Sequence, residues 1–299
     1  MLLPLWEVIV LIPVDFIYED EWLSNYDMVT LQPNDEQSFV SRNIEKSDIN
    51  TNRPVPFHYG VAYSDVLTLN FFIGRYINNN IVRLNEEEIN DIRSWLESPK
   101  TPKKLTVITT ASEEDTIIFY GLFTDIQPYV VSGSYYGLYL TFTCDSPYGY
   151  TEDYETEYEI RSSGDTEGYF YNISAERYEY LMPKIIIQSS SSFGINETLS
   201  IKNVSDNNKT MQFTLPQGKT KLIIDCKEKI ITDENGTLIS LGTLGYINDD
   251  SYTQFINLLN MYWLSLIYGV NNLIFTPSSG HTIDKIIIST KFIVKLGGF

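Results

Sequence analysis

One stretch of the chain has apolar residues at helical spacing, and these residues are Ile89, Ile92, Trp95 and Leu96. Asn85 precedes the stretch as an N-cap, and Glu88 stands at the position that completes a capping box with it. Pro99 ends the pattern, because proline disfavours helix in the residue before it. The spacing therefore predicts an amphipathic helix over about residues 86–98, with the four apolar residues as its structural core.

Most other apolar residues of the first half fall in short runs typical of β-strands. These runs cover residues 67–73, 105–110, 117–124 and 135–143. The turn formers of residues 112–115 and 132–134 separate the last three runs, which predicts an antiparallel meander. An amphipathic helix beside such strands needs a sheet to cover. The first half is therefore expected to be an α+β domain, in which an antiparallel sheet carries one covering helix.

The second half shows many short strand-like runs and little helical spacing. The runs cover residues 183–187, 197–201, 210–215, 221–226, 228–232, 237–241, 272–276, 285–290 and 292–296. Asn235-Gly236 is a strong hairpin signal, and Gln217-Gly218 separates another pair of runs. One short helix is expected near residues 255–263, capped by Asp250 or Ser251. Regularly spaced short strands indicate a β-sandwich, so the chain is expected to be mainly β.

The two predicted domains cover residues 1–150 and 151–299. The boundary lies in the acidic stretch 148–161, which is interpreted either as a strand with one acidic face or as a solvated linker. Before the first domain's core, residues 8–12 and 14–18 are strand-like runs separated by Pro13, which indicates an edge, a bend or a bulge. Residues 1–12 lack the basic start of a signal peptide and are too short to span a bilayer, so a buried strand is expected, without membrane insertion.

Residues 24–65 are polar and contain little core material. Such a long segment is unusual within a compact domain. It is either a surface loop or an arm that becomes ordered against a neighbouring subunit, and the arm is the favoured interpretation. Short strands are plausible within it at residues 39–44 and 57–63.

The charge of the chain argues against a phosphate-binding surface. The formal net charge is −18, whereas a nucleic-acid binder should show a basic stripe. The three lysines that follow the predicted helix, Lys100, Lys103 and Lys104, are interpreted as a solvated turn. The chain has 22 tyrosines, which suit half-buried strands and protein contact surfaces. Cys144 and Cys226 are expected to be buried free thiols.

No catalytic, cofactor-binding or metal-ligating residues are expected. The two histidines, His58 and His281, have no cysteine or carboxylate at metal-ligand spacing. The sequence also lacks a nucleophile elbow, a phosphate-binding glycine loop and a dinucleotide fingerprint. The sequence contains many carboxylates, so it does not exclude a catalytic acid–base pair of the glycosidase kind.

Four segments together carry a family resemblance, and they are residues 92–96 (IRSWL), 141–148 (TFTCDSPY), 180–185 (YLMPKI) and 268–272 (YGVNN). In this order, with the helix between sheet strands and a β-domain following, the chain resembles the distal tail proteins of long-tailed bacteriophages. The resemblance covers most of the chain from about Asp15 onward. The residues before Asp15 and the acidic balance depart from the family pattern.

The resemblance implies a structural protein of the virion, at the phage tail tip, assembled in the bacterial cytoplasm. The first domain would resemble the tail tube and form a hexameric ring, single or stacked, and the second would be a galectin-like β-sandwich. The implied partners are the tail tube protein, the tail-associated lysin or hub protein, and receptor-binding proteins. DNA would pass through the ring without specific binding, and the net charge predicts acidic side chains along its inner wall.

A second hypothesis comes from a different class, because a fold alone does not exclude a function. The second domain is alternatively a glycan-binding or glycosidase module of a protein that recognises cell surfaces. Its aromatic residues are suited to stack on sugar rings, although core and interface positions are favoured for them; they include Tyr169, Phe170, Tyr171 and Trp263.

Overall fold

The computed structural model describes residues 13–31, 42–46, 58–78, 80–109, 116–239 and 262–295. They form a mainly β protein whose strands all pair in antiparallel fashion, so the predicted fold class is confirmed. The chain divides into two compact units. Unit 1 runs up to Glu152 and also takes in Ile293 and Val294, and unit 2 runs Asp153–Phe292.

Unit 1 is built on a 10-stranded sheet whose main path is β2-β1-β8-β9-β10-β6-β3. The strands are β1 (Pro13–Tyr18), β2 (Glu21–Trp22), β3 (Val29–Leu31), β6 (Thr68–Ile77), β7 (Asn80–Val82), β8 (Lys103–Thr109), β9 (Thr116–Val131), β10 (Ser134–Cys144), β11 (Gly149–Tyr150) and β21 (Ile293–Val294). A 3₁₀-helix, η1 (Leu23–Tyr26), connects β2 to β3. The predicted meander is confirmed as β8-β9-β10, with β9 extending well beyond residue 124.

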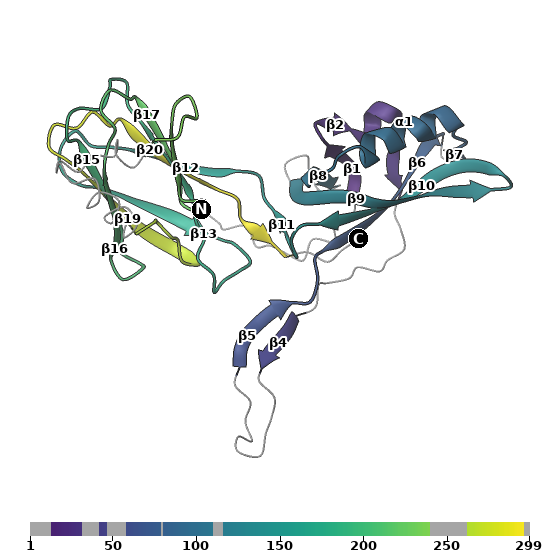
Figure 1. Ribbon diagram of the computed structural model, residues 1–299, viewed down its shortest axis with the longest axis horizontal. Helices are drawn as coiled ribbons and strands as arrows, with labels where there is room; N and C mark the ends of the chain where they lie inside the picture. The colour runs from purple at the N-terminus through teal and green to yellow at the C-terminus, as the bar shows by residue number, and fades with distance from the viewer. Residues whose placement is uncertain are drawn as a thin grey trace, which may run out of the picture. The chain divides into compact units, whose positions relative to one another are not determined.

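The helix α1 (Glu86–Glu97) lies across one face of this sheet (Figure 1). Asn85 caps it through a complete capping box: the Asn85 side chain accepts from the Glu88 amide, and the Glu88 side chain accepts from the Asn85 amide. Three acidic residues in the first turn face the positive end of the helix dipole. The helix ends with Ser98 as its C-cap, just before Pro99, as the sequence predicts.

One interpretation of the first half needs correction. Residues 24–31 are not part of a core-poor segment, because Met28 is buried in the core of unit 1 and β3 pairs with β6. Within the rest of that segment, β4 (Arg42–Lys46) and β5 (His58–Tyr63) form a separate two-stranded sheet. The strand expected within residues 1–12 and the turn expected at residues 112–115 lie outside the described residues.

Unit 2 is a sandwich of two sheets with strand orders β12-β20-β14-β17-β18 and β13-β19-β15-β16. The strands are β12 (Tyr154–Glu159), β13 (Thr166–Asn172), β14 (Lys184–Gln188), β15 (Thr198–Asn203), β16 (Lys209–Thr214), β17 (Lys221–Asp225), β18 (Ile230–Asp233), β19 (Gly269–Pro277) and β20 (Lys285–Thr290). Buried residues of both sheets form one core, in which the rings of Tyr158 and Phe275 lie 4.8 Å apart. Of the two interpretations of residues 148–161, the acidic strand is right: β12 exposes its glutamates.

The second half differs from the sequence prediction in a few further elements. β13 had no predicted counterpart, and of the run 237–241 the described part forms only an isolated bridge between Thr232 and Leu238. The helix expected near residues 255–263 lies almost entirely outside the described residues. The last predicted strand, assigned with residues 151–299, instead pairs with β11 in unit 1 as β21.

Candidate interaction surfaces

The apolar face of α1 lies against the core of unit 1. Ile89, Ile92, Trp95 and Leu96 are all buried. Trp95 stacks on Tyr26, with ring centroids 4.8 Å apart, and its Nε1 donates a hydrogen bond of 3.1 Å to the Tyr18 carbonyl. Arg75 of β6 adds an ion pair of 2.6 Å to Glu88. The hydrogen bond from the Asn85 amide is the largest cause that lowers the pKa of Glu88. The Arg75 guanidinium lowers this pKa further. These residues therefore hold the helix in place.

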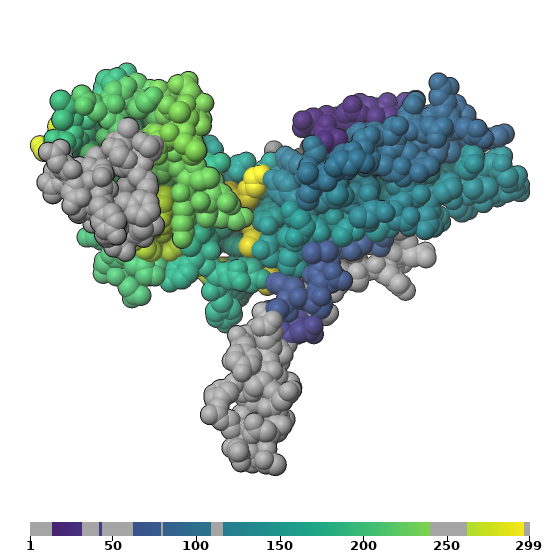
Figure 2. All heavy atoms as spheres, viewed as in Figure 1, coloured from purple at the N-terminus to yellow at the C-terminus, as the bar shows by residue number. Residues whose placement is uncertain are grey.

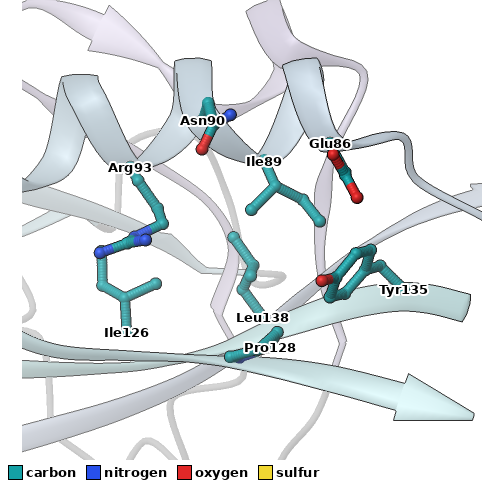
Figure 3. Close-up of a pocket in the computed structure, with 8 residues that line it drawn as sticks. All are labelled: Glu86, Ile89, Asn90, Arg93, Ile126, Pro128, Tyr135 and Leu138. Carbon is teal, nitrogen blue, oxygen red and sulfur yellow. The ribbon is translucent and has the colours of Figure 1, made fainter. Parts of the chain in front are cut away.

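A pocket of about 210 Å³ lies beside this core, between α1 and the β9–β10 hairpin. Figure 3 shows its apolar lining: Ile126, Pro128 and Leu138 come from the hairpin, and Ile89 points towards them from α1. Glu86, Asn90 and Arg93 of α1 also line it, with the Arg93 side chain reaching towards Ile126, and Tyr135 of β10 completes the lining. We call this the helix–hairpin pocket. In Figure 2 the blue helix lies directly against the teal β9–β10 hairpin.

The pocket borders a strand edge that lacks a partner. β8 pairs with β9 only as far as Gly121, whereas β10 pairs with β9 as far as Val131. Among the described residues no strand pairs with the other side of β9 from Leu122 to Val131, and we call this stretch the open β9 edge. An exposed strand edge presents unpaired amide and carbonyl groups, which makes it a template for a further strand. The sequence pattern does not predict this edge, although Ile126, Pro128 and Val130 alternate there with polar residues.

The β4–β5 hairpin is a second place where strands of the described residues lack further paired strands. The described residues contain no third strand paired with it. At its base the Tyr63 ring lies 5.5 Å from the Arg42 guanidinium carbon and 5.8 Å from the Lys295 ammonium. The Tyr148 ring packs edge-on against Tyr63, with centroids 6.3 Å apart. The base is therefore anchored, while among the described residues the two strands pair only with each other.

The sheet of unit 1 also has an outward face, opposite α1. There Phe72 of β6, Tyr129 of β9 and Tyr139 of β10 form an aromatic cluster with centroids 4.7 to 5.9 Å apart. Next to it, Thr124 and Thr143 share a hydrogen bond of 2.8 Å. Residues with exposed aromatic and hydroxyl groups of this kind are typical of protein contact surfaces.

Unit 2 exposes tyrosines on the outer face of its four-stranded sheet. Tyr169 and Tyr171 of β13 are 54% and 45% exposed, and Val270, the cross-strand neighbour of Tyr171, is 48% exposed. Phe170 between the two tyrosines faces the core and is fully buried. Of the four aromatic residues singled out in the sequence, Tyr169 and Tyr171 are thus surface residues, and Trp263 is partly buried against the core.

Buried polar groups fix the loops of unit 2. Asn203 donates to the Ser265 carbonyl (3.1 Å) and to the Asn271 side chain (2.9 Å), which in turn accepts from the Ile267 amide. Asp206 accepts hydrogen bonds from the hydroxyls of Tyr180 and Tyr262. Segments 180–185 and 268–272, which carry part of the family resemblance, therefore form a hydrogen-bonded end of the sandwich.

The structure describes the surroundings of His281 and of both cysteines. His281 lies in a turn, where its Nε2 is 2.8 Å from the Arg161 carbonyl oxygen, and His58 lies in β5. Cys144 and Cys226 are buried free thiols, as predicted, and burial raises the pKa of each to about 12. Within the described part of the chain, no three His, Cys, Asp or Glu side chains are placed to hold a metal ion. The same part contains no helix long and apolar enough to cross a membrane.

Comparison with known sequence families assigns both halves of the chain. Residues 12–146 match the family described as "Phage tail protein N-terminal domain". Residues 148–280 match the family described as "Phage tail C-terminal domain". No protein of curated function matches the sequence.

Solved structures share the fold of the whole chain. The crystal structure of the phage SPP1 Dit protein, described as a paradigm of the hub adsorption apparatus in phages that infect Gram-positive bacteria, superposes with a TM-score of 0.61 at 16% identity, covering 93% of this chain and 98% of that chain. A chain of the phage P2 baseplate, in its activated conformation with Ca, gives a TM-score of 0.51 at 11% identity over 95% of this chain and 99% of that chain. The P2 baseplate with Sr gives the same values.

Proposed function

The chain belongs to a family of phage tail proteins built from an N-terminal and a C-terminal domain, and from this premise we propose that it is the distal tail protein of a phage. Unit 1 assembles into a six-subunit ring at the tail tip. The ring joins the tail tube to the lysin hub and to the receptor-binding apparatus. Unit 2 projects from the ring as a galectin-like sandwich that docks other tail proteins.

The observation that carries this proposal is the match of both halves to phage tail domains, combined with the fold shared with SPP1 Dit. The surfaces of unit 1 support an assembling protein. It offers an open strand edge, an apolar pocket beside that edge and an aromatic outward face. When one surface of a subunit fits a different surface of the next, repeated contacts close into a ring if the rotation allows.

The proposal assigns no catalytic step to the chain. It works by binding and assembly, so variants of the histidines, His58→Ala and His281→Ala, should assemble like the parent. The ring passes DNA without holding it, because a chain of net charge −18 offers little to attract phosphates.

Native mass spectrometry and negative-stain imaging test the proposal. Purified protein at micromolar concentration, alone or mixed with its hub partner, should give hexamers or pairs of hexamers that appear as rings. A protein that stays monomeric in every condition, including with the hub partner, contradicts the ring.

Saccharide binding by unit 2 is a second candidate function, favoured by the exposed rings of Tyr169 and Tyr171. Tyrosine rings on a flat sheet face suit stacking against sugar rings. Calorimetric titration with solubilised host cell-wall glycans decides this point. Binding that is lost in a Tyr169→Ala/Tyr171→Ala variant supports it, and the absence of heat at millimolar saccharide rejects it.

A further inference from the structure

An exposed turn of unit 2 carries the only Asn-Gly pair in the sequence. Asn235 and Gly236 form this turn, which follows β18 and leads to the bridge between Leu238 and Thr232. Both turn residues are exposed. Gly236 has a φ of +74°, and a Cβ at this position would meet no described atom within 4 Å. Water therefore has free access to the pair.

Asparagine is a thermolabile residue, and a following glycine makes it more so. Once the glycine backbone nitrogen has lost its proton, it attacks the side-chain carbonyl carbon of the asparagine. A carbon–nitrogen bond forms, the bond to the side-chain nitrogen breaks, and ammonia leaves. Water then opens the cyclic imide at one of its two carbonyl groups, which gives aspartate or isoaspartate. Glycine permits the attack because it has no Cβ to shield its nitrogen or to restrict its backbone.

We propose that Asn235 is a site of spontaneous deamidation, and that the ion pair between Lys219 and Asp233 controls its rate. The Lys219 ammonium donates to Asp233 Oδ2 at 2.7 Å. Asp233 Oδ1 accepts hydrogen bonds from the amides of Asn235 (3.0 Å) and Thr237 (2.9 Å). The Asp233 side chain is 4% exposed, so one buried carboxylate fixes the backbone on both sides of Gly236. The intact ion pair therefore keeps the turn closed.

The closed turn also restrains the nucleophile. The Gly236 nitrogen donates a hydrogen bond of 3.1 Å to the Asp233 carbonyl oxygen. While this bond holds, the nitrogen keeps its proton and does not approach the Asn235 side chain. Deamidation therefore requires a local opening of the turn, and local openings cost less free energy than unfolding of the whole domain. The fraction of modified protein then records how often this turn opens.

Modification loosens the turn that slows it. Aspartate at position 235 adds a third carboxylate next to Asp233 and Glu234, and neighbouring like charges repel one another. Isoaspartate adds one methylene to the main chain, so the amides of the turn no longer match the position of the Asp233 carboxylate. Because ammonia has left, the change is irreversible. The end of β18 therefore opens more easily after each modification.

Peptide mass spectrometry of protein incubated at mildly alkaline pH tests the proposal, because deamidation replaces an amide by a heavier carboxyl group. The parent should convert at Asn235, and the urea-unfolded chain should convert faster. Lys219→Met should accelerate conversion in the folded protein by about tenfold or more, the usual effect of losing a hydrogen bond to a charged group. Lys221→Met removes a lysine two positions further along the chain, and this matched control should convert like the parent.

The same digest supplies internal controls. Asn207 is an exposed turn residue, but Asn208 follows it instead of a glycine. Gln217 precedes Gly218 in another exposed turn, but its longer side chain has to close a larger and less favourable ring. Neither residue should convert on the time scale of Asn235.

Two further measurements separate the ion pair from a general loss of structure. Hydrogen exchange of β14 peptides should be the same in the parent and in Lys219→Met, which shows that the variant keeps its fold. Asp233→Asn keeps a hydrogen-bond acceptor but loses the ion pair, so it should accelerate conversion at Asn235 in the same way.

Three outcomes overturn the inference. The absence of conversion at Asn235 in the urea-unfolded chain shows that the pair is not labile. Equal rates in the folded and the unfolded chain show that the turn does not restrain the reaction. If Lys219→Met and Asp233→Asn convert no faster than Lys221→Met, the ion pair does not control the rate.

Discussion

At the scale of single residues, Trp95 joins the helix to the sheet of unit 1. It stacks on Tyr26 and Phe16 and donates to the Tyr18 carbonyl. Trp95→Ala should lower the free energy of unfolding of unit 1 by about 3–5 kcal/mol, the usual range for a large aromatic removed from a core. Denaturant unfolding followed by far-UV circular dichroism measures the loss. Tyr178→Ala, which removes a fully exposed ring, is the control, and a Trp95 variant as stable as that control contradicts the assignment.

A buried aspartate of unit 2 predicts a dependence of stability on pH. The Lys219 ammonium donates to Asp233 at 2.7 Å and, with the amides of Thr237 and Asn235, lowers the pKa of Asp233 from 3.8 to about 2. A carboxyl with a depressed folded-state pKa contributes stability above its unfolded pKa and loses it as the pH falls through the folded value. The contribution should therefore be complete above about pH 4 and disappear towards pH 2.

Thermal unfolding between pH 6 and pH 2 compares the parent with Asp233→Asn. The variant should melt at a lower temperature near neutral pH, and the difference should shrink as the pH approaches about 2. Asp165→Asn, at an exposed turn position, controls for the loss of one negative charge. A difference that stays constant across the range would show that the ion pair has no part in acid stability.

At the scale of elements, α1 depends on its capping box. Asn85→Ala removes the acceptor for the Glu88 amide and should cost about 1 kcal/mol of stability, the typical value for such a cap. Ser94→Ala, at an exposed mid-helix position, should instead leave stability unchanged or raise it by a few tenths of a kcal/mol. Equal stability of the two variants in urea titrations would contradict the role of the cap.

At the scale of the whole molecule, the last described strand returns to unit 1. Val294 of β21 pairs with Gly149 and packs against the core of unit 1. Val294→Asp places a charge there and should destabilise unit 1 by about 1–3 kcal/mol, while unit 2 keeps its stability. Hydrogen exchange followed by mass spectrometry separates the two, because peptides of β9 and β11 should lose protection and those of β14 should not.

The exposed Val270 of unit 2 provides the matched control for that experiment. Val270→Asp should change the exchange of neither unit to a comparable degree, because the side chain is 48% exposed. If Val294→Asp instead increases exchange in β14 and leaves β9 and β11 unchanged, the last strand belongs to unit 2.

Local patterns in the sequence are sufficient to predict the elements whose stabilising groups are close together in the chain. The sequence predicts the helix, its cap and its end before Pro99, because the groups involved lie within four residues of one another. The sequence also predicts the Asn235-Gly236 turn. Gly236 adopts a φ of +74°, a backbone conformation that favours glycine. The family resemblance likewise rested on segments whose residues are adjacent in the chain.

Which distant segments meet depends instead on packing across the whole fold. Gly149 and Val294 pair across nearly half the chain, so no local pattern revealed that the final strand belongs to unit 1. Met28 lies in a polar stretch, yet the packing of unit 1 buries it. The open β9 edge follows from the point at which β8 ends relative to β10, and strand registers of this kind depend on side-chain packing and turn geometry across the whole sheet. Local sequence patterns therefore do not predict the candidate surfaces, because each surface is formed by residues from separate elements.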